Sequence, residues 1–220
     1  MTSLRGGVKL TLMKKLFLYI FLVLMVSCSE EKSKKSVYDI KIGERIDNIL
    51  SQKQIKLYYR SEETSESKSD IEIYGKDKKY SIVVVPNKAN IFLHKFDNVQ
   101  LIYNNENLKI EYIGGIKHMN VGKCLKERTK QMNLYIDQFD TKDSNIINKE
   151  SKQLNLEDGT IVKRTKIAFP QKKIKINFSC YDYSNFKGSS KLNSAYRFEK
   201  WSYLFNDWLW NMKKIKILEK

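Results

Sequence analysis

Proline, glycine and histidine are scarce in this sequence, and each scarcity argues against a class of protein. Two prolines and nine glycines among 220 residues argue against a collagen-like, low-complexity or disordered chain. The two histidines, His94 and His118, lie in no HxH, HExxH or CxxC pattern, so the common zinc motifs are absent. No GxSxG elbow of a serine hydrolase is present either. We therefore expect a protein without a metal or other cofactor that acts by binding and is not an enzyme.

The sequence also lacks an apolar run long enough to span a bilayer as a helix, which requires roughly 20 residues. Its longest apolar run extends from Leu16 to Val26, directly after Lys14 and Lys15, and a polar segment begins at Ser27. A short cationic segment followed by an apolar run of this length is typical of a secretory signal peptide.

The residues that end this run, Val26, Ser27 and Cys28, resemble the lipobox of bacterial lipoproteins, with Met25 in place of the usual leucine. The resemblance implies a diacylglycerol on the sulfur of Cys28, cleavage after Ser27 and a further acyl chain such as palmitate on the new N-terminus. Several acyl chains together give stable membrane anchoring. Ser29 resembles the residue that directs sorting to the outer membrane. The alternative is an ordinary secretory signal with an incidental cysteine.

This interpretation divides the chain into three parts. Residues 1–27 are the expected signal peptide, with Met13 as a second candidate start, and residues 28–37 are the lipidated cysteine and a flexible polar tether. Residues 38–220 are expected to form one domain that faces the periplasm. Loss of residues 1–27 removes four cationic residues and no acidic one, which lowers the formal net charge from +16 to +12.

A mature charge of +12 has several interpretations. It favours an anionic lipid surface, an acidic protein partner or nucleic acid. A location in the cell envelope favours an anionic lipid surface or an acidic protein partner, and we expect no nucleic acid as a partner. The alternative is a solvated surface that keeps the protein soluble and binds nothing.

The sequence has three cysteines. If Cys28 carries lipid, Cys124 and Cys180 remain, which is an even number in an oxidising compartment. We predict a disulfide between them. The alternative is that Cys124, close to the start of a helix, is a reactive nucleophile.

The alternation of apolar residues predicts an α+β fold: a largely antiparallel sheet of about seven strands with two or three helices packed on it. Gly114 and Gly115 are expected to form a turn, and Asp158 and Gly159 a type I′ turn. The predicted strands are residues 38–43, 55–60, 71–74, 80–85, 98–103, 108–113, 154–157, 160–169 and 172–182. The predicted helices are residues 44–53, 120–139 and 198–212.

Cationic residues recur on the last two predicted strands. If these strands pair, one face of the sheet is cationic, and two aromatic side chains on the outer face of the final helix would extend that surface. The alternative is an exposed sheet face without a partner. The predicted partner surface consists of Lys163, Arg164, Lys166, Lys173, Lys175, Tyr203 and Trp210.

Together these patterns predict a membrane-anchored envelope lipoprotein of the structural or assembly type that acts by binding. Its expected location is the outer membrane, facing the periplasm. One alternative is an immunity lipoprotein that neutralises a secreted toxin in the periplasm. Another is an envelope hydrolase whose site no sequence motif reveals.

Overall fold

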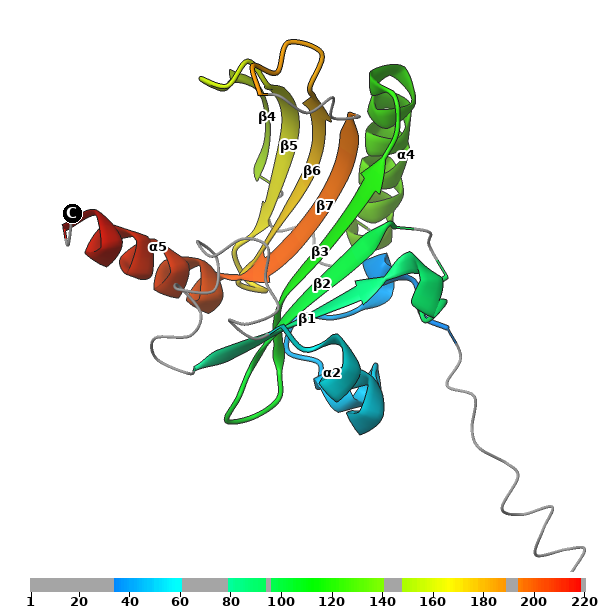
Figure 1. The fold of residues 1–220 in the computed structure, drawn as a ribbon, viewed down its shortest axis with the longest axis vertical. Coiled ribbons are helices and arrows are strands. Elements are labelled where there is room, and N and C mark those ends of the chain that lie inside the picture. The colour runs from blue at the N-terminus through cyan, green and yellow to red at the C-terminus, as the bar shows by residue number, and fades with distance from the viewer. Residues whose placement is uncertain (1–33, 61–78, 94–95, 141–147, 189–193, 219–220) are drawn as a thin grey trace, which may run out of the picture. The chain divides into compact units, whose positions relative to one another are not determined.

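The chain forms one antiparallel sheet with helices packed on it (Figure 1). The structure is a computed structural model that describes residues 34–60, 79–93, 96–140, 148–188 and 194–218. Within these ranges there are seven strands and three α-helices, which confirms the predicted α+β class.

The elements follow one another along the chain with short connections. The helices are α2 (Gln52–Tyr58), α4 (Val121–Asp140) and α5 (Tyr203–Leu218). Short 3-10 turns lie at Val37–Asp39, Ile46–Asn48 and Asn87–Ala89. The strands are β1 (Tyr80–Pro86), β2 (Asn98–Asn104), β3 (Ile110–His118), β4 (Asn148–Asn155), β5 (Ile161–Phe169), β6 (Ile174–Asp182) and β7 (Ala195–Ser202).

The strand order is β1-β2-β3-β7-β6-β5-β4, so the sheet consists of two meanders that meet at β7. Strand β7 pairs antiparallel with β3 on one side and with β6 on the other. Helix α4 forms the connection from the first meander to the second. The last strand in the sequence is therefore a central strand of the sheet.

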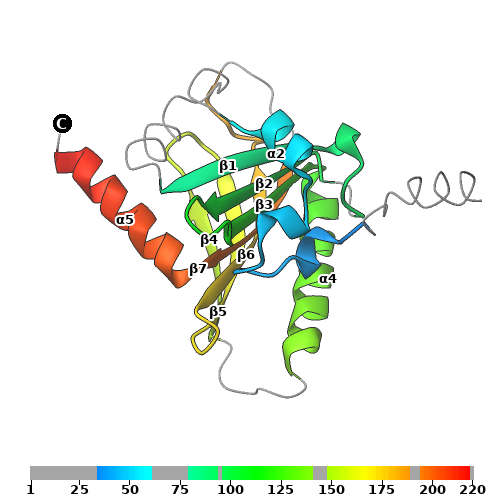
Figure 2. The same cartoon turned by 90° about the horizontal axis from the view of Figure 1, so that it is seen from below.

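The sheet has helices on both sides, as the view in Figure 2 shows. On the side that we call the α4 face, Tyr135 of α4 packs on Phe178 and Phe198. On the opposite side, the α5 face, Phe205 packs on Tyr80 and Tyr112.

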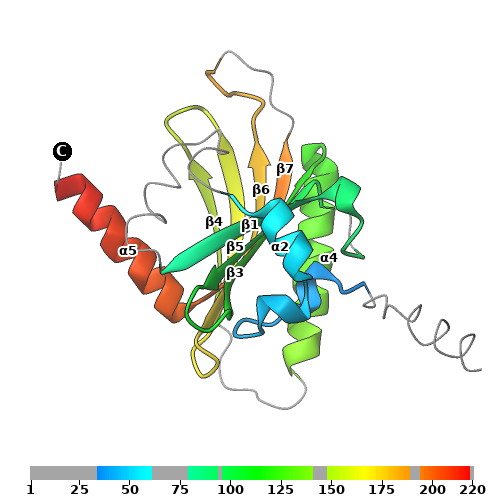
Figure 3. The same cartoon turned by 60° about the horizontal axis from the view of Figure 1, so that its bottom comes forward.

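The N-terminal segment is part of the α4-face core and not a strand of the sheet. Val37, Ile40 and Ile46 are fully buried there, and Figure 3 shows the segment passing beside α4. The predicted strand 38–43 is thus wrong. Lys35 forms an isolated parallel β-bridge with Phe92, and Ser36 and Val37 are buried. The last residues of the predicted tether 28–37 are therefore packed against the domain.

Helix α2 replaces the predicted strand 55–60, and the predicted helix 44–53 is limited to a 3-10 turn and the start of α2. The reason is local. Ser51 caps the helix with a capping box, in which its hydroxyl accepts from the Gln54 amide while the Gln54 side chain accepts from the Ser51 amide. The predicted strand 71–74 lies outside the described residues.

The hairpin predicted at 98–113 is confirmed, but its second strand continues through Gly114 and Gly115. The predicted turn at these glycines is wrong, because both lie in the extended strand β3, each beneath an aromatic ring. A Cβ atom on Gly114 would lie 2.5 Å from the Tyr112 hydroxyl, and one on Gly115 would lie 2.7 Å from the Phe96 ring. Each glycine makes room for an aromatic ring that lies across the strand.

Helix α4 begins as predicted, because the Asn120 side chain accepts from the Lys123 amide at 2.8 Å. The hairpin between β4 and β5 is also confirmed, although its turn is not type I′. That turn requires positive φ at two residues, whereas Gly159 has φ +86° and Asp158 has no positive φ. Asp158 instead accepts from the Thr160 amide at 2.8 Å.

The predicted final helix 198–212 is wrong at its start, because Phe198 and Trp201 lie in β7 and α5 begins at Tyr203. The Ser202 hydroxyl accepts from the Phe205 amide at 3.0 Å, which starts the helix at this point. The aromatic spacing of the sequence fits a helix, but pairing of β7 with two neighbouring strands outweighs that local pattern.

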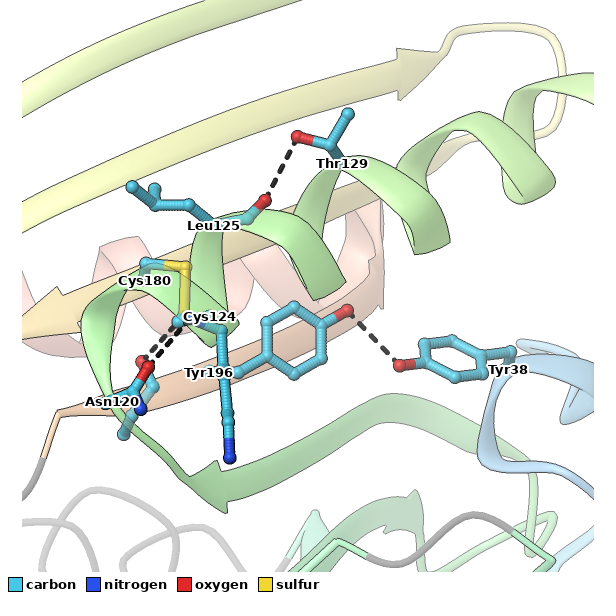
Figure 4. The surroundings of a disulfide bond; sticks show 9 residues. Tyr38, Asn120, Cys124, Leu125, Thr129, Cys180 and Tyr196 are labelled. Carbon is cyan, nitrogen blue, oxygen red and sulfur yellow. Dashed lines mark hydrogen bonds between the residues drawn. A yellow bond between two sulfur atoms is a disulfide. The ribbon is translucent and has the colours of Figure 1, made fainter.

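A disulfide joins the first turn of α4 to β6, as Figure 4 shows. Cys124 and Cys180 have a sulfur–sulfur distance of 2.04 Å and a Cα–Cα distance of 5.9 Å, so the predicted pairing is present. Both side chains are buried. The bond fixes the start of α4 against the α4 face.

We predict that the Cys124→Ala, Cys180→Ala double variant loses about 4 kcal/mol of unfolding free energy, since the bond closes a loop with a sequence separation of 56 residues. Urea unfolding of protein matured in an oxidising compartment measures this loss. Cys28→Ala alone serves as the control and should leave the stability unchanged. Two freely titratable thiols at positions 124 and 180 in such protein would contradict the prediction.

Lys200 ties the N-terminal segment to the sheet. Its ammonium nitrogen donates to the carbonyl oxygens of Ile40 at 2.7 Å and Tyr38 at 3.5 Å and lies 5.4 Å from the ring centroid of Tyr135. The side chain is only 4 % exposed. This burial lowers the pKa of Lys200 to about 8, although the carboxylates of Asp39 and Glu44 oppose the shift.

This shift predicts that the protein becomes more stable as the pH rises from about 8 to about 10. In that window the unfolded lysine, with a pKa of about 10.4, binds more protons than the folded one, so the unfolding free energy should increase by about 2 kcal/mol. Above this window the trend reverses, because burial raises the pKa of Tyr38 and Tyr135 and ionisation then favours the unfolded chain.

Urea unfolding across this pH range measures the effect. The Lys200→Met variant should lose the rise, while Lys56→Met, at an exposed position of α2, should keep it. A rise of equal size in both variants would contradict the assignment to Lys200.

Candidate functional site

The α5 face of β5, β6 and β7 carries a group of polar and charged side chains. In the sheet register, Asn177 pairs with Lys166 and with Glu199, while Ser179 pairs with Arg164 and with Arg197. Directly paired residues of antiparallel strands point to the same face, so these side chains are neighbours. We call this surface the polar sheet face; it consists of Arg164, Lys166, Lys175, Asn177, Ser179, Arg197 and Glu199.

Two of these side chains, Arg197 and Glu199, form a hydrogen-bonded cluster with Tyr112. Arg197 Nη2 lies 3.1 Å from Glu199 Oε1 and 3.4 Å from the Tyr112 hydroxyl, which itself donates to Glu199 at 3.1 Å. Burial and the Glu199 carboxylate raise the pKa of Tyr112, so this hydroxyl stays protonated and donates. Gly114 leaves the space in which the Tyr112 ring lies.

Other polar atoms of this face are buried without a hydrogen-bond partner among the described residues. They are Asn177 Oδ1, Ser179 Oγ, Arg197 Nε and Trp201 Nε1. Ser179 is fully buried and Asn177 is 5 % exposed. Buried polar groups reduce stability unless they are hydrogen-bonded. Because neighbouring atoms cover these four atoms, a partner can contact only the partly exposed side chains of Arg164, Lys166, Lys175 and Arg197 on this face.

Cations outnumber anions on the polar sheet face, with Arg164, Lys166, Lys175 and Arg197 against Glu199. On the adjoining strand β4, Lys152 and Glu150 extend the same face with one charge of each sign. The pKa of Glu150, on the neighbouring strand β4, is lowered by nearby cations. A hydrogen bond from Lys152 lowers the pKa of Glu150 most, and the charges of Lys166 and Arg164 lower it further. The surface therefore favours negatively charged groups.

Only part of the predicted partner surface lies together. Arg164, Lys166 and Lys175 share the polar sheet face as predicted. Lys163 is wrong as a member, because it pairs with Cys180 and lies on the α4 face. Lys173 is also wrong, because it lies in the turn before β6 with φ +52°. A shift of one residue along a strand changes the face, which explains the error at Lys163.

The two predicted aromatic residues separate in the structure. The ammonium nitrogen of Lys175 lies 4.7 Å from the centroid of the Tyr203 ring, so Tyr203 borders the polar sheet face. Trp210 is 61 % exposed and lies about 10 Å further along α5, at 1.5 Å rise per residue. It is therefore a separate exposed feature.

Sequence reasoning missed Arg197, Glu199 and Tyr112. Glu199 lies inside the predicted final helix 198–212 and Arg197 directly before it. Their alternation with Tyr196, Phe198 and Lys200 is the signal that indicates a strand. Tyr112 carries no signal of its own, since its role depends on Gly114 and on the neighbouring strand.

The remaining candidate positions offer no metal site. His118 is exposed and its Nδ1 lies 2.6 Å from the Asp97 carboxylate, while His94, Ser27 and Cys28 lie outside the described residues. No group of three or more potential metal ligands occurs in the part of the chain that is described. None of the helices in these same ranges has both the length and the apolar character needed to cross a membrane.

Comparison with family models, with curated proteins and with solved structures finds no match to this chain. Functional inference therefore depends on the polar sheet face itself. Its partly exposed cations and neighbouring aromatic rings are suited to recognising an anionic surface.

We predict that Gly114→Ala lowers the unfolding free energy by about 1–3 kcal/mol, because the new methyl group would displace the Tyr112 ring and break its bonds to Arg197 and Glu199. Urea unfolding measures the loss. Near-ultraviolet circular dichroism should change as well, since Tyr112 stacks with Trp201 at 6.4 Å.

Gly122→Ala is the matched control. A Cβ atom at Gly122 has its nearest contact at 3.8 Å, from the Asn120 side chain, so this change should not lower stability. Equal stability of the Gly114→Ala variant and the natural chain would show that Tyr112 does not need this space.

Proposed function

We propose that this protein is a lipid-anchored protein of the bacterial cell envelope that binds an acidic protein partner through the polar sheet face. The observation that carries the proposal is the excess of partly exposed cations on that face. The lipid anchor is supported by the residues Val26, Ser27 and Cys28 after an apolar run.

The composition of the face supports a protein as the partner. Arginine, tyrosine and tryptophan are enriched where proteins contact one another, and Arg164 and Arg197 lie here beside Tyr181 and Trp201. The guanidinium group of arginine binds a carboxylate through two parallel hydrogen bonds, which gives both affinity and orientation. An acidic protein surface supplies such carboxylates.

The anchor restricts where the partner can be met. Lys34, where the described domain begins, is six positions after Cys28 in the sequence. A chain of this length spans at most about 21 Å, so a domain anchored at Cys28 stays close to the membrane surface. The partner then belongs to the envelope or enters it.

Two measurements in cells test the proposal. The Cys28→Ala variant should lose labelling by a fatty-acid analogue, because the acylated sulfur is absent. A photo-crosslinking amino acid at Lys166 should capture a discrete acidic protein, whereas the same group at Lys56 of α2 should not. The Arg164→Glu, Lys175→Glu variant should abolish the product.

Lys53→Glu with Lys88→Glu is the matched control, since it changes the net charge equally at two exposed positions away from this face. It should retain the crosslink. Undiminished labelling of Cys28→Ala would refute the anchor, and an identical product from Lys56 would refute the binding face. Capture of a secreted toxin would assign the protein to the immunity type, and capture of an envelope assembly protein to the structural type.

A further inference from the structure

A second cationic surface lies where β3 leads into α4. An open groove of about 580 Å³ is bordered there by the end of β3 and the first turns of α4. We call it the lysine groove; its lining residues are Lys117, His118, Met119, Asn120, Lys123, Lys126, Glu127 and Lys130. It is distinct from the polar sheet face, because α4 packs on the opposite side of the sheet from α5.

The spacing of the lysines places like charges side by side. Lys123, Lys126 and Lys130 are three and four residues apart on α4, so they form one stripe along the helix. Like charges at this spacing destabilise a helix by a few tenths of a kcal/mol per pair. Glu127 lies at the same helical spacing from Lys123 and Lys130 and opposes part of this repulsion, so the stripe keeps an excess of positive charge.

No carboxylate neutralises these lysines within the described part of the chain, where none of them forms an ion pair. Glu127 is the one carboxylate among the lining residues, and its Oε1 accepts from the Gln131 side chain at 3.0 Å. The imidazole of His118 is paired with Asp97. The ammonium groups are thus available to an external anion.

We propose that the lysine groove binds the phosphate head groups of anionic phospholipids in the membrane that holds the lipid anchor. This inference rests on the proposed anchor at Cys28. Juxtamembrane lysines gain about 1 kcal/mol each near an anionic bilayer, so three or four of them orient a domain that is already tethered. Charge complementarity and the position of the tether both support this occupant.

The residues that follow the tether contact a segment that is only a few residues from the groove in the sequence. Lys35 bridges Phe92, and the Leu93 amide donates to the Lys35 carbonyl oxygen at 3.1 Å. Asp97, which contacts His118 of the groove, follows only four residues after Leu93, a separation of at most about 14 Å. A membrane that holds Cys28 is therefore within reach of the groove.

Apolar side chains lie near both ends of this surface. Leu93 is 61 % exposed beside the tether, and Leu134, one helical turn after Lys130, is 49 % exposed. Exposed leucines next to lysines are typical of surfaces that rest in the interface between head groups and acyl chains.

The test uses the mature chain, residues 28–220, with Cys28→Ser, so that no acyl chain contributes to binding. Co-sedimentation is compared for vesicles of phosphatidylcholine alone and vesicles with added phosphatidylglycerol. The protein should bind only the second kind. The Lys123→Gln, Lys126→Gln, Lys130→Gln variant should lose about tenfold or more in affinity. The matched variant Lys53→Gln, Lys56→Gln, Lys88→Gln should lose much less.

Inorganic phosphate and polyglutamate are titrated calorimetrically into the same proteins. Saturable phosphate binding that the groove variant abolishes, without binding to vesicles, would show a site for a soluble phosphate and overturn the proposal. Polyglutamate binding at the groove without binding to vesicles would show an acidic protein site and also overturn it. Equal losses in the two triple variants would show general charge attraction. None of these outcomes depends on acylation, which the labelling of Cys28→Ala tests separately.

Discussion

The antiparallel pairing of β7 with both β3 and β6 is the constraint on which the rest of the structure depends. It joins two meanders that the chain forms far apart in sequence into one sheet. It also distributes neighbouring side chains to opposite sides. Phe198 and Lys200 contribute to the α4 face, whereas Arg197 and Glu199 contribute to the polar sheet face. The same eight residues thus build the hydrophobic core and position the candidate site.

Close packing on both sides of the sheet then fixes the helices. Gly114 and Gly115 allow aromatic rings to lie across β3, one on each face. The disulfide between Cys124 and Cys180 holds the first turn of α4 against β6. Because the lysine groove is formed by β3 and these same turns of α4, its shape depends on that bond. A covalent link in the core therefore supports a charged surface outside it.

The two cationic surfaces support one model of how an anchored binding protein works. In this proposal the lysine groove lies against the head groups, where the tether also leads. The polar sheet face lies on the other side of the sheet, so in this proposal it faces away from the head groups. If both proposals hold, distributing the positive charge between two surfaces would let membrane attraction orient the domain without covering the proposed partner site. Neutralising one surface would then leave the other functional.

Local signals in the sequence determined a large part of this description. Apolar runs, alternation and turn residues identified β1, β2, β5 and β6, Asn120 marked the start of α4, and the cysteine count indicated the disulfide. The proposal of a lipid anchor rests on residues 14–28 of the sequence. Only the tertiary structure decided that Ala195–Ser202 is a strand, that Gly114 lies within β3, and that Lys163 and Arg164 lie on opposite faces. The physical reason is that capping and alternation act over a few neighbouring residues. Strand pairing and register, in contrast, depend on residues that are distant in the sequence.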